Sequence, residues 1–458
     1  MNGHAEQLST RWLPIAVAGA AVLLGLVAGF NPALALAGAF AIAFVTITLL
    51  NLTAGVCIFA VLSFLDEVLP SGGFSINKLM GILLIVSWLA AVTAGEDRRR
   101  KLFENFGFLY LLVLFIAWAG LSATWADDPG AAIGAVTRYA PNVALFLIVY
   151  AAVRTRHDAL LVVGALVVGT LISAAYGIVI PVPADVDGRL SGALGNANAT
   201  ATALAVGVAL AGALAIALRD NPWLRFGAAV GVPLCFVALF LTVSRGGLVA
   251  LGAVLIAAVL MAGRRRTVAL ALTAVAVIGS IGYFAAIAPP EARDRIVQSD
   301  GGAGRSDIWT VGWRMVEANP VAGIGAGNFA TSSVHYLLEP GAIQRADFIV
   351  DDPKVAHNTY LEILAELGAV GLALFLGILA CTFGFAFKAV RAFARLGDRQ
   401  MEIVSRALVV ALVGSLVAAF FGSREFNNQL WLLMALPPAL LGVARAQLAE
   451  RFGGAEVS

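Results

Sequence analysis

Long apolar runs separated by short polar connections make up most of the chain. A helix that crosses a bilayer needs about 20 apolar residues, with about 17 to 25 tolerated. That length predicts about 12 to 14 membrane-spanning helices, and therefore an all-α polytopic membrane protein with residues 1–458 as a single integral membrane domain. The predicted segments are approximately 13–30, 32–50, 53–69, 77–95, 106–125, 134–153, 158–180, 199–218, 224–243, 246–263, 267–287, 358–387, 402–421 and 428–446.

Basic residues fall in alternate connections between these segments. Lys and Arg near helix ends stay on the cytoplasmic side, so these loops are predicted to be cytoplasmic, together with both termini. The basic groups are Arg98 to Lys101, Arg154 and Arg156, Arg219 and Arg225, Arg264 to Arg266, and Lys388 to Arg399. The other connections are then predicted to face the periplasm or the exterior, near 70–76, 126–133, 181–198, 244–245, 288–357 and 422–427.

The composition agrees with a membrane protein. Of the 458 residues, 60% are hydrophobic and only 13% are charged, and the mean hydropathy is +0.91. A net charge of +2 gives no case for nucleic-acid binding. Cys57, Cys235 and Cys381 lie far apart in apolar runs, so we interpret them as small buried hydrophobic residues.

The connection 288–357 is much longer than the others, and long loops in compact proteins are more often functional or disordered than idle. Apolar residues at helical spacing predict a helix over 306–317, with Trp309 and Trp313 suited to a membrane surface. The Asn319-Pro320 pair is predicted to end it. This large loop is therefore expected to be partly helical and to carry chemistry.

Two arginines stand out on the predicted outer side, where basic residues are otherwise rare. Arg189 follows Gly188 and leads toward Asn198, which is either a helix cap or part of a site. Arg245 lies between two membrane helices and needs an anionic partner. Either a structural ion pair or a phosphate clamp would satisfy it, and the neighbouring glycines at 246–247 would permit a phosphate to approach.

A third arginine opens the helix predicted in the large loop. Arg305 follows a glycine-rich stretch, and the helix-end amides and the guanidinium together would attract an anion. Asp307 offers an alternative, a salt bridge to Arg305. The later glycines of 323–327 are predicted to form a turn, since no βαβ unit surrounds them as a dinucleotide site requires.

His357 lies where the large loop meets the next membrane helix. A neutral histidine there can accept a proton from a hydroxyl near neutral pH; capping the helix is the alternative role. Asn358, Glu362 and Glu366 follow at a spacing of four and predict a polar stripe that runs into the membrane. Glu362 would orient His357 or pair with an arginine, whereas Glu366 would be either functional or a packing partner.

At these residues the sequence resembles the O-antigen ligase and O-antigen polymerase superfamily of bacterial polytopic membrane glycosyltransferases. The resemblance covers residues 185–375 specifically and the other helices only in general character. It rests on the order and separation of several motifs: Gly195-Asn196-Ala197-Asn198, Ser244-Arg245-Gly246, Gly304-Arg305 to Trp309, Asn319-Pro320 to Gly325, and His357-Asn358-Thr359-Tyr360-Leu361 with Glu366 and Gly368.

The resemblance implies a GT-C-like architecture in the bacterial inner membrane and a periplasmic active site that needs no cofactor. The donor would be a glycan on undecaprenyl diphosphate, transferred to a hydroxyl of lipid A core or a similar acceptor. By position, Arg245 and Arg305 would hold the diphosphate with Arg189 as a third contact, and His357 would be the base. Asn358, Tyr360 and Glu362 would support them.

Three alternatives stay open at this level. A polysaccharide polymerase would use the same donor with another lipid-linked glycan as acceptor. A lipid-linked glycan flippase would bind its substrate through arginines in a central path, although here the distinctive charges gather at one face. Asp351 and Asp352 would allow a divalent metal, but adjacent loop carboxylates are usually solvated, and the resemblance implies no metal.

Overall fold

The computed structural model describes residues 18–19, 21–66, 68, 76–93, 106–180, 189–297, 305–337 and 354–452. Within these residues every regular element is a helix, which confirms the all-α prediction. The α-helices are α2 (Pro32–Leu50), α3 (Leu52–Leu62), α4 (Ile76–Thr93), α6 (Phe106–Leu121), α7 (Pro129–Ala152), α8 (Arg156–Val179), α9 (Ala197–Ala217), α10 (Pro222–Leu241), α11 (Arg245–Met261), α12 (Arg266–Gly282), α13 (Pro290–Val297), α14 (Arg305–Ala318), α15 (Phe329–Leu337), α17 (Thr359–Leu396), α18 (Arg399–Ala419) and α19 (Asn428–Phe452).

The apolar helices follow the predicted segments. In the described part of the chain, ten helices are long and apolar enough to cross a membrane, and four shorter apolar helices occupy the remaining predicted segments. The shorter ones are Ala21–Phe30, Leu52–Leu62, Lys78–Ala90 and Arg245–Met261. The largest difference is at α17, which continues to Leu396 instead of ending near 387 and carries the basic residues that we placed in a loop.

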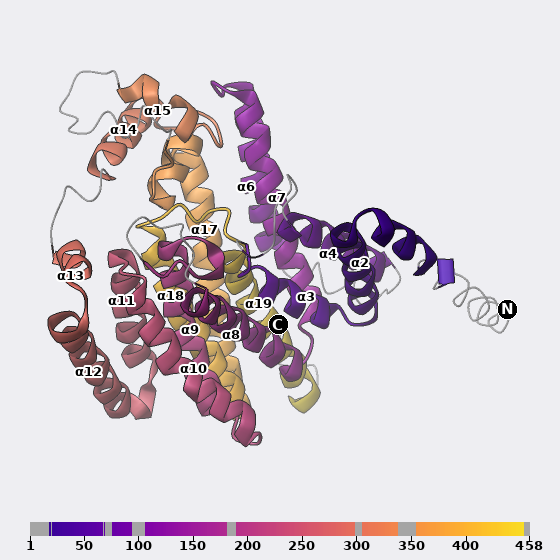
Figure 1. The fold of residues 1–458 in the computed structure, drawn as a ribbon, viewed down its shortest axis with the longest axis vertical. Coiled ribbons are helices and arrows are strands. Elements are labelled where there is room, and N and C mark those ends of the chain that lie inside the picture. Colours follow the sequence, from indigo (N-terminus) through magenta and orange to yellow (C-terminus); the bar gives the residue numbers. More distant parts are fainter. Residues whose placement is uncertain are drawn as a thin grey trace.

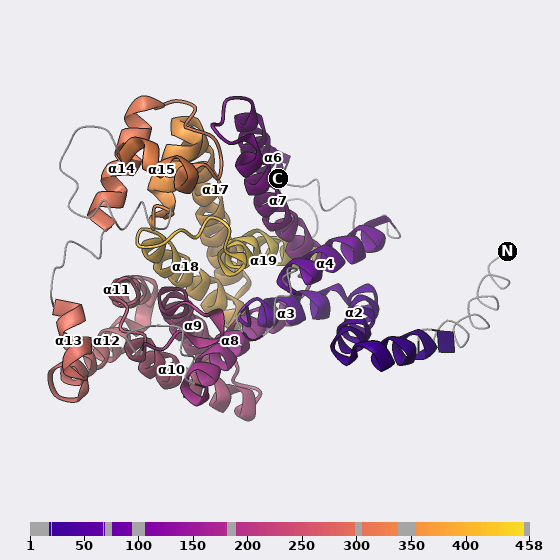
Figure 2. The ribbon, with the colours of Figure 1, turned by 45° about the horizontal axis from the view of Figure 1, so that its top comes forward.

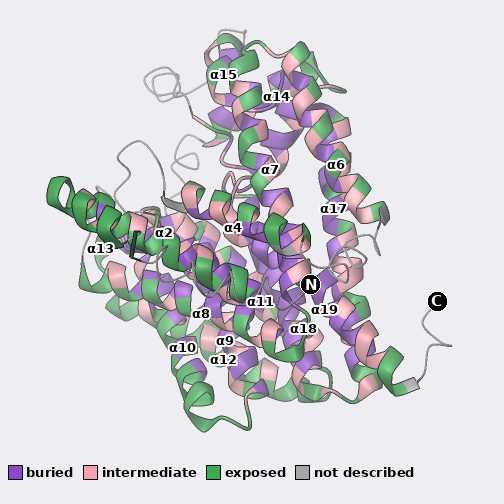
Figure 3. Ribbon diagram, turned by 90° about the vertical axis from the view of Figure 1, so that its right-hand side faces the viewer, coloured by how far each residue is buried: buried purple, intermediate pink, exposed green. Residues whose placement is uncertain are grey.

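The helices α7, α9, α17, α18 and α19 pack against one another in the interior, and buried residues concentrate along them (Figure 3). Lipid-facing side chains remain exposed, as on α12, which has no buried residue. Small residues allow close helix approach: a side chain added at Gly207 or Gly414 would collide with the neighbouring helix. Cys235 is buried and Cys57 and Cys381 are half-buried, consistent with apolar packing.

The two predicted sets of loops lie at opposite ends of the bundle. At the basic end, comprising residues 154–156, 217–220, 262–266 and 396–406, Arg156 pairs with Asp398 at 2.9 Å and Gln400 donates to the Ala217 carbonyl at 3.2 Å. At the loop end, comprising residues 122–128, 189–198, 242–245, 354–359 and 420–427, hydrogen bonds join different connections, as between the Leu190 amide and the Leu241 carbonyl. These described connections thus separate into the two predicted groups. Which end is cytoplasmic stays a prediction, and 71–75 and 94–105 lie outside the described residues.

Helices α14 and α15, from the large loop, pack at the loop end beside α17 and the tip of α6 (Figures 1 and 2). The predicted helix over 306–317 is confirmed as α14, which ends at Ala318, immediately before Asn319-Pro320. Its inner face buries Ile308, Val311 and Met315, while Trp313 stays 55% exposed. The apolar face therefore fixes α14 on the bundle and leaves Trp313 free to contact a membrane surface.

Candidate functional site

Arg245 opens α11 at the loop end. Ser244 caps this helix by accepting from the Gly247 amide at 3.1 Å. The two glycines after Arg245 have a packing reason, because a Cβ at Gly246 or Gly247 would lie 2.9 Å from Phe421 or 2.4 Å from Ala201. The exposed Arg245 side chain reaches α13, where Nε donates to the Arg295 carbonyl at 2.6 Å.

Three arginines form a cationic group at this point. Burial and the nearby charges of Arg245 and Arg295 lower the pKa of Arg305, which starts α14. Arg295 was not singled out by the sequence argument, because it lies in a polar helix with charges of both signs. An anion between α11, α13 and α14 would relieve the repulsion among these guanidinium groups.

His357 lies within electrostatic reach of Arg305. Burial and the charges of Arg305 and Lys354 lower its pKa below the usual value of 6.5, so the imidazole is neutral at neutral pH. Trp309 on α14 donates to the Ala356 carbonyl at 3.0 Å and thereby holds α14 against the histidine. His357 is half-buried, and within the described part of the chain no hydrogen bond to its ring is formed.

Backbone strain occurs beside Arg245 and at His357. Among the described residues, the only non-glycine residues with positive φ are Val243 at 47° and His357 at 50°. Such conformations cost on the order of 1–3 kcal/mol each and concentrate at functional sites. The strained positions are immediately before Ser244-Arg245 and at the candidate base, which supports a common site.

The cap of α17 is Asn358, not His357. The Asn358 side chain accepts from the amides of Tyr360 and Leu361 at 3.1 and 3.2 Å. The Tyr360 hydroxyl donates to the Leu416 carbonyl at 2.9 Å, away from the loop-end residues. Both residues therefore position the start of α17, and the imidazole is left available for chemistry.

A buried polar cluster joins the start of α17 to the connection between α18 and α19. Its members are Thr359, Glu362, Ser423, Arg424 and Glu425. Glu362 accepts a hydrogen bond from Ser423, and among the described residues it forms no hydrogen bond or ion pair with His357. Arg424 donates to the Asn198 carbonyl at 2.7 Å and its amide donates to Thr359 at 2.8 Å.

Burial lowers the pKa of Arg424 to about 10 and raises the pKa of its neighbour Glu425. These two residues are 8% and 2% exposed, so both charges depend on the surrounding cluster. Sequence reasoning missed both residues. Arg245 was selected because it is a basic residue on the predicted outer side, where basic residues are rare. The same argument applies to Arg424.

Arg189 is connected to this buried polar cluster through Asn198, which also accepts from Arg424. Its guanidinium donates to the Thr242 carbonyl at 2.9 Å and to the Asn198 side chain at 3.2 Å. Asn198 also accepts from Ser244 at 2.7 Å, while Asn196 caps α9. The capping role that we considered for Asn198 thus belongs to Asn196, and Asn198 instead connects Arg189 to the turn before Arg245.

The turn predicted at 323–327 is confirmed and explains Glu366. Gly323, Gly325 and Gly327 all have positive φ, and a Cβ at Gly323 would lie 2.3 Å from the Glu366 backbone. The Glu366 carboxylate accepts from the amides of Gly327 at 2.7 Å and Phe329 at 3.1 Å. Glu366 is therefore more than a packing partner, because it satisfies the open amides at the start of α15.

The polar stripe of Asn358, Glu362 and Glu366 does not continue into the membrane along an unbroken helix. Gly368, directly after this segment, has φ 65° and ψ −169° inside α17, so the helix is interrupted there. A Cβ at Gly368 would lie 2.1 Å from the Val321 carbonyl oxygen. The first turns of α17 therefore belong to the loop-end assembly, together with the turn at 323–327.

Some predicted features lie outside the described residues, namely Gly188, the glycines of 301–304, Asp351, Asp352 and most of 330–352. Among the residues that are described, no group of three or more His, Cys, Asp or Glu side chains is arranged to hold a metal ion.

Comparison with known proteins bears on the same region. Residues 230–376 match the family described as O-antigen ligase, and no curated protein matches the chain. The matched range includes Arg245, Arg305 and His357, whereas Arg189 and Arg424 lie outside it. The chain is therefore a polytopic membrane protein in which residues 230–376 are similar to the O-antigen ligase family, and this similarity supports the O-antigen ligase superfamily.

Proposed function

We propose that the protein is a glycosyltransferase that moves a glycan from undecaprenyl diphosphate to a hydroxyl of lipid A core or a similar acceptor, at the periplasmic face of the inner membrane. The observation that carries the proposal is the position of Arg305, which feels the charges of Arg245 and Arg295 and whose own charge acts on His357. A cationic group and a neutral base thus share one site.

In the proposed reaction, His357 accepts the proton of the acceptor hydroxyl as that oxygen bonds to the anomeric carbon of the donor glycan. The bond from the anomeric carbon to the diphosphate oxygen breaks, and undecaprenyl diphosphate leaves with the electron pair. Arg245 and Arg305 stabilise the charge that accumulates on the diphosphate. Arg295 joins this clamp, and Arg189 is a further, supporting contact that also holds the turn before Arg245.

The remaining site residues position this machinery. Asn358 and Tyr360 fix the first turn of α17, and Glu362 with Ser423 joins that turn to the connection between α18 and α19. The basic end defines the cytoplasmic side by the tendency of Lys and Arg to stay there. The proposed site at the loop end then faces the periplasm, so a nucleotide sugar in the cytoplasm is not the donor.

The test is glycan transfer by purified protein supplied with a lipid-linked glycan and lipid A core. We expect His357→Ala to lose about 10²- to 10⁴-fold in rate. Arg245→Gln and Arg305→Gln should each lose about 10²- to 10³-fold. His335→Ala is the matched control, because His335 is exposed on α15 of the same loop. Normal transfer by His357→Ala would refute the assignment of the base.

The same clamp and base would serve a polymerase, in which a second lipid-linked glycan is the acceptor. Supplying either lipid A core or only lipid-linked glycan, and then sizing the products, separates these functions. Products extended by repeated units without lipid A core would assign polymerisation. Movement of the donor across the bilayer without any transfer would instead identify a flippase.

A further inference from the structure

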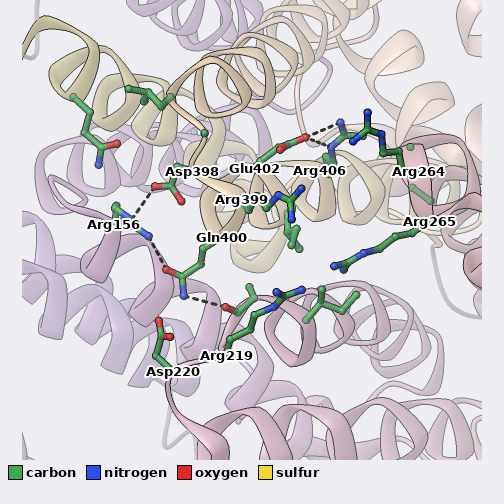
Figure 4. A pocket seen from close by; sticks show the side chains of 18 of the residues that line it. Arg156, Arg219, Asp220, Arg264, Arg265, Asp398, Arg399, Gln400, Glu402 and Arg406 are labelled. Atoms are coloured by element: carbon green, nitrogen blue, oxygen red, sulfur yellow. Dashed lines mark hydrogen bonds and ion pairs between the residues drawn. The ribbon is translucent and has the colours of Figure 1, made fainter. Parts of the chain in front are cut away.

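A cavity of about 980 Å³ opens at the basic end of the bundle, opposite to the loop end (Figure 4). It lies among the ends of α8, α9, α11, α17, α18 and α19. Seven arginine and three acidic side chains line it, which gives the lining a formal excess of four positive charges. Such an excess in a concave site raises the local concentration of anions.

Two of the three carboxylates that line this cavity already pair with arginines of the same lining. Asp398 pairs with Arg156 at 2.9 Å and also caps α18 by accepting from the Met401 amide at 3.1 Å. Glu402 pairs with Arg406 at 2.8 Å, one helical turn away on α18. These pairs hold the rim of the cavity together, and Asp220 is the one carboxylate among the described lining residues that remains outside an ion pair.

Three other arginines extend into the cavity from different elements (Figure 4). Arg219 follows α9, Arg265 lies between α11 and α12, and Arg399 begins α18. Across the described residues, none of the three forms an ion pair. Converging guanidinium groups repel one another, and their planar forks match the oxygens of phosphate groups.

Membrane topology alone does not account for this arrangement. The tendency of Lys and Arg to stay in the cytoplasm requires only that they lie near the helix ends. Arg391 follows this tendency, although it is exposed on α17 and does not line the cavity. Topology does not require guanidinium groups from three separate elements to converge on one cavity.

We propose that this cavity binds an anion with two or more phosphate groups, held by Arg219, Arg265 and Arg399. Ligand pockets are typically about 300–1,000 Å³, and a single phosphate would leave most of this volume empty. Apolar wall residues such as Ile216 and Ile403 also allow a less polar part of the ligand to enter. The site is distinct from the proposed active site and does not depend on its chemistry.

The first experiment measures binding of tripolyphosphate to the full chain in phosphatidylcholine nanodiscs. We expect saturable binding that weakens with salt, a dissociation constant raised about tenfold in Arg265→Gln or Arg399→Gln, and one raised about a hundredfold in the double variant. Arg391→Gln is the matched control and should bind as the wild type does. If Arg399→Gln does not fold, Arg219→Gln tests the same prediction.

The second experiment uses cardiolipin, a lipid with two phosphates, as a minor component of the nanodiscs. Native mass spectrometry then counts the cardiolipin retained by the wild type and by the same variants. Loss of retention in Arg265→Gln but not in Arg391→Gln assigns the site to a lipid headgroup, whereas saturable binding of tripolyphosphate alone assigns it to a soluble anion. The proposal is overturned if neither probe binds, or if Arg391→Gln weakens binding as much as the cavity variants do.

Discussion

Removal of the Glu366 carboxylate should loosen the part of the large loop that packs over the site. Glu366 is 3% exposed, and its two oxygens accept from the amides of Gly327 and Phe329 at 2.7 and 3.1 Å. A buried donor without a partner costs about 1–3 kcal/mol. Glu366→Ala leaves two such donors, so α15 and the turn before it should lose about 2–6 kcal/mol of local stability.

Glu366→Gln should remove only one of the two hydrogen bonds that the Glu366 carboxylate accepts. The amide oxygen can still accept from one backbone amide, but the new NH₂ group faces the other donor, so the loss should be about 1–3 kcal/mol. Hydrogen exchange of the purified protein measures both variants at the amides of α15, with α9 as an internal reference. Glu317→Gln is the control, because Glu317 is exposed on α14. Exchange at α15 in Glu366→Ala no faster than in this control would refute the reasoning.

Two further predictions concern His357 and the residue after it. Burial and the charges of Arg305 and Lys354 lower the pKa of His357, so the acid limb of kcat/KM for glycan transfer should lie below pH 6.5, and Arg305→Gln should move that limb upward. An acid limb that this substitution does not move would contradict the proposed electrostatics. Asn358→Ala should lower stability by about 1 kcal/mol in thermal unfolding and also reduce transfer, whereas Asn358→Asp should keep the cap. Equal losses in the alanine and aspartate variants would show that capping is not what Asn358 contributes.

The sequence by itself determined the membrane architecture. Apolar segments of the length that a bilayer requires, and basic residues in alternate connections, are local properties of the chain. They were sufficient to predict the membrane helices and to divide the connections between two ends. The helical spacing of apolar residues and the Asn319-Pro320 pair predicted α14 and its end. Arg245 and His357 could be selected from the sequence because a charge or an imidazole at the mouth of a membrane helix is conspicuous. Arg305 could be selected because it follows a glycine-rich stretch at the start of a predicted helix.

Only the tertiary structure decided which side chains work together. Arg295 and Arg424 belong to elements far from His357 in sequence, and the contacts that bring them to the loop end are not encoded in any local pattern. The partner of Glu362 and the role of Glu366 were likewise set by neighbouring connections. A buried polar group needs a partner, but its chemistry does not specify which of several distant residues will supply it.

The same distinction applies to the two ends of the bundle. Sequence pattern identified the basic residues as a sign of topology, because hydropathy and charge act on each loop separately. The convergence of Arg219, Arg265 and Arg399 on one cavity depends on how the end of α9, the connection between α11 and α12, and the start of α18 lie beside one another. Helix packing decides that geometry, since it fixes the relative positions of helix ends that no single segment can determine.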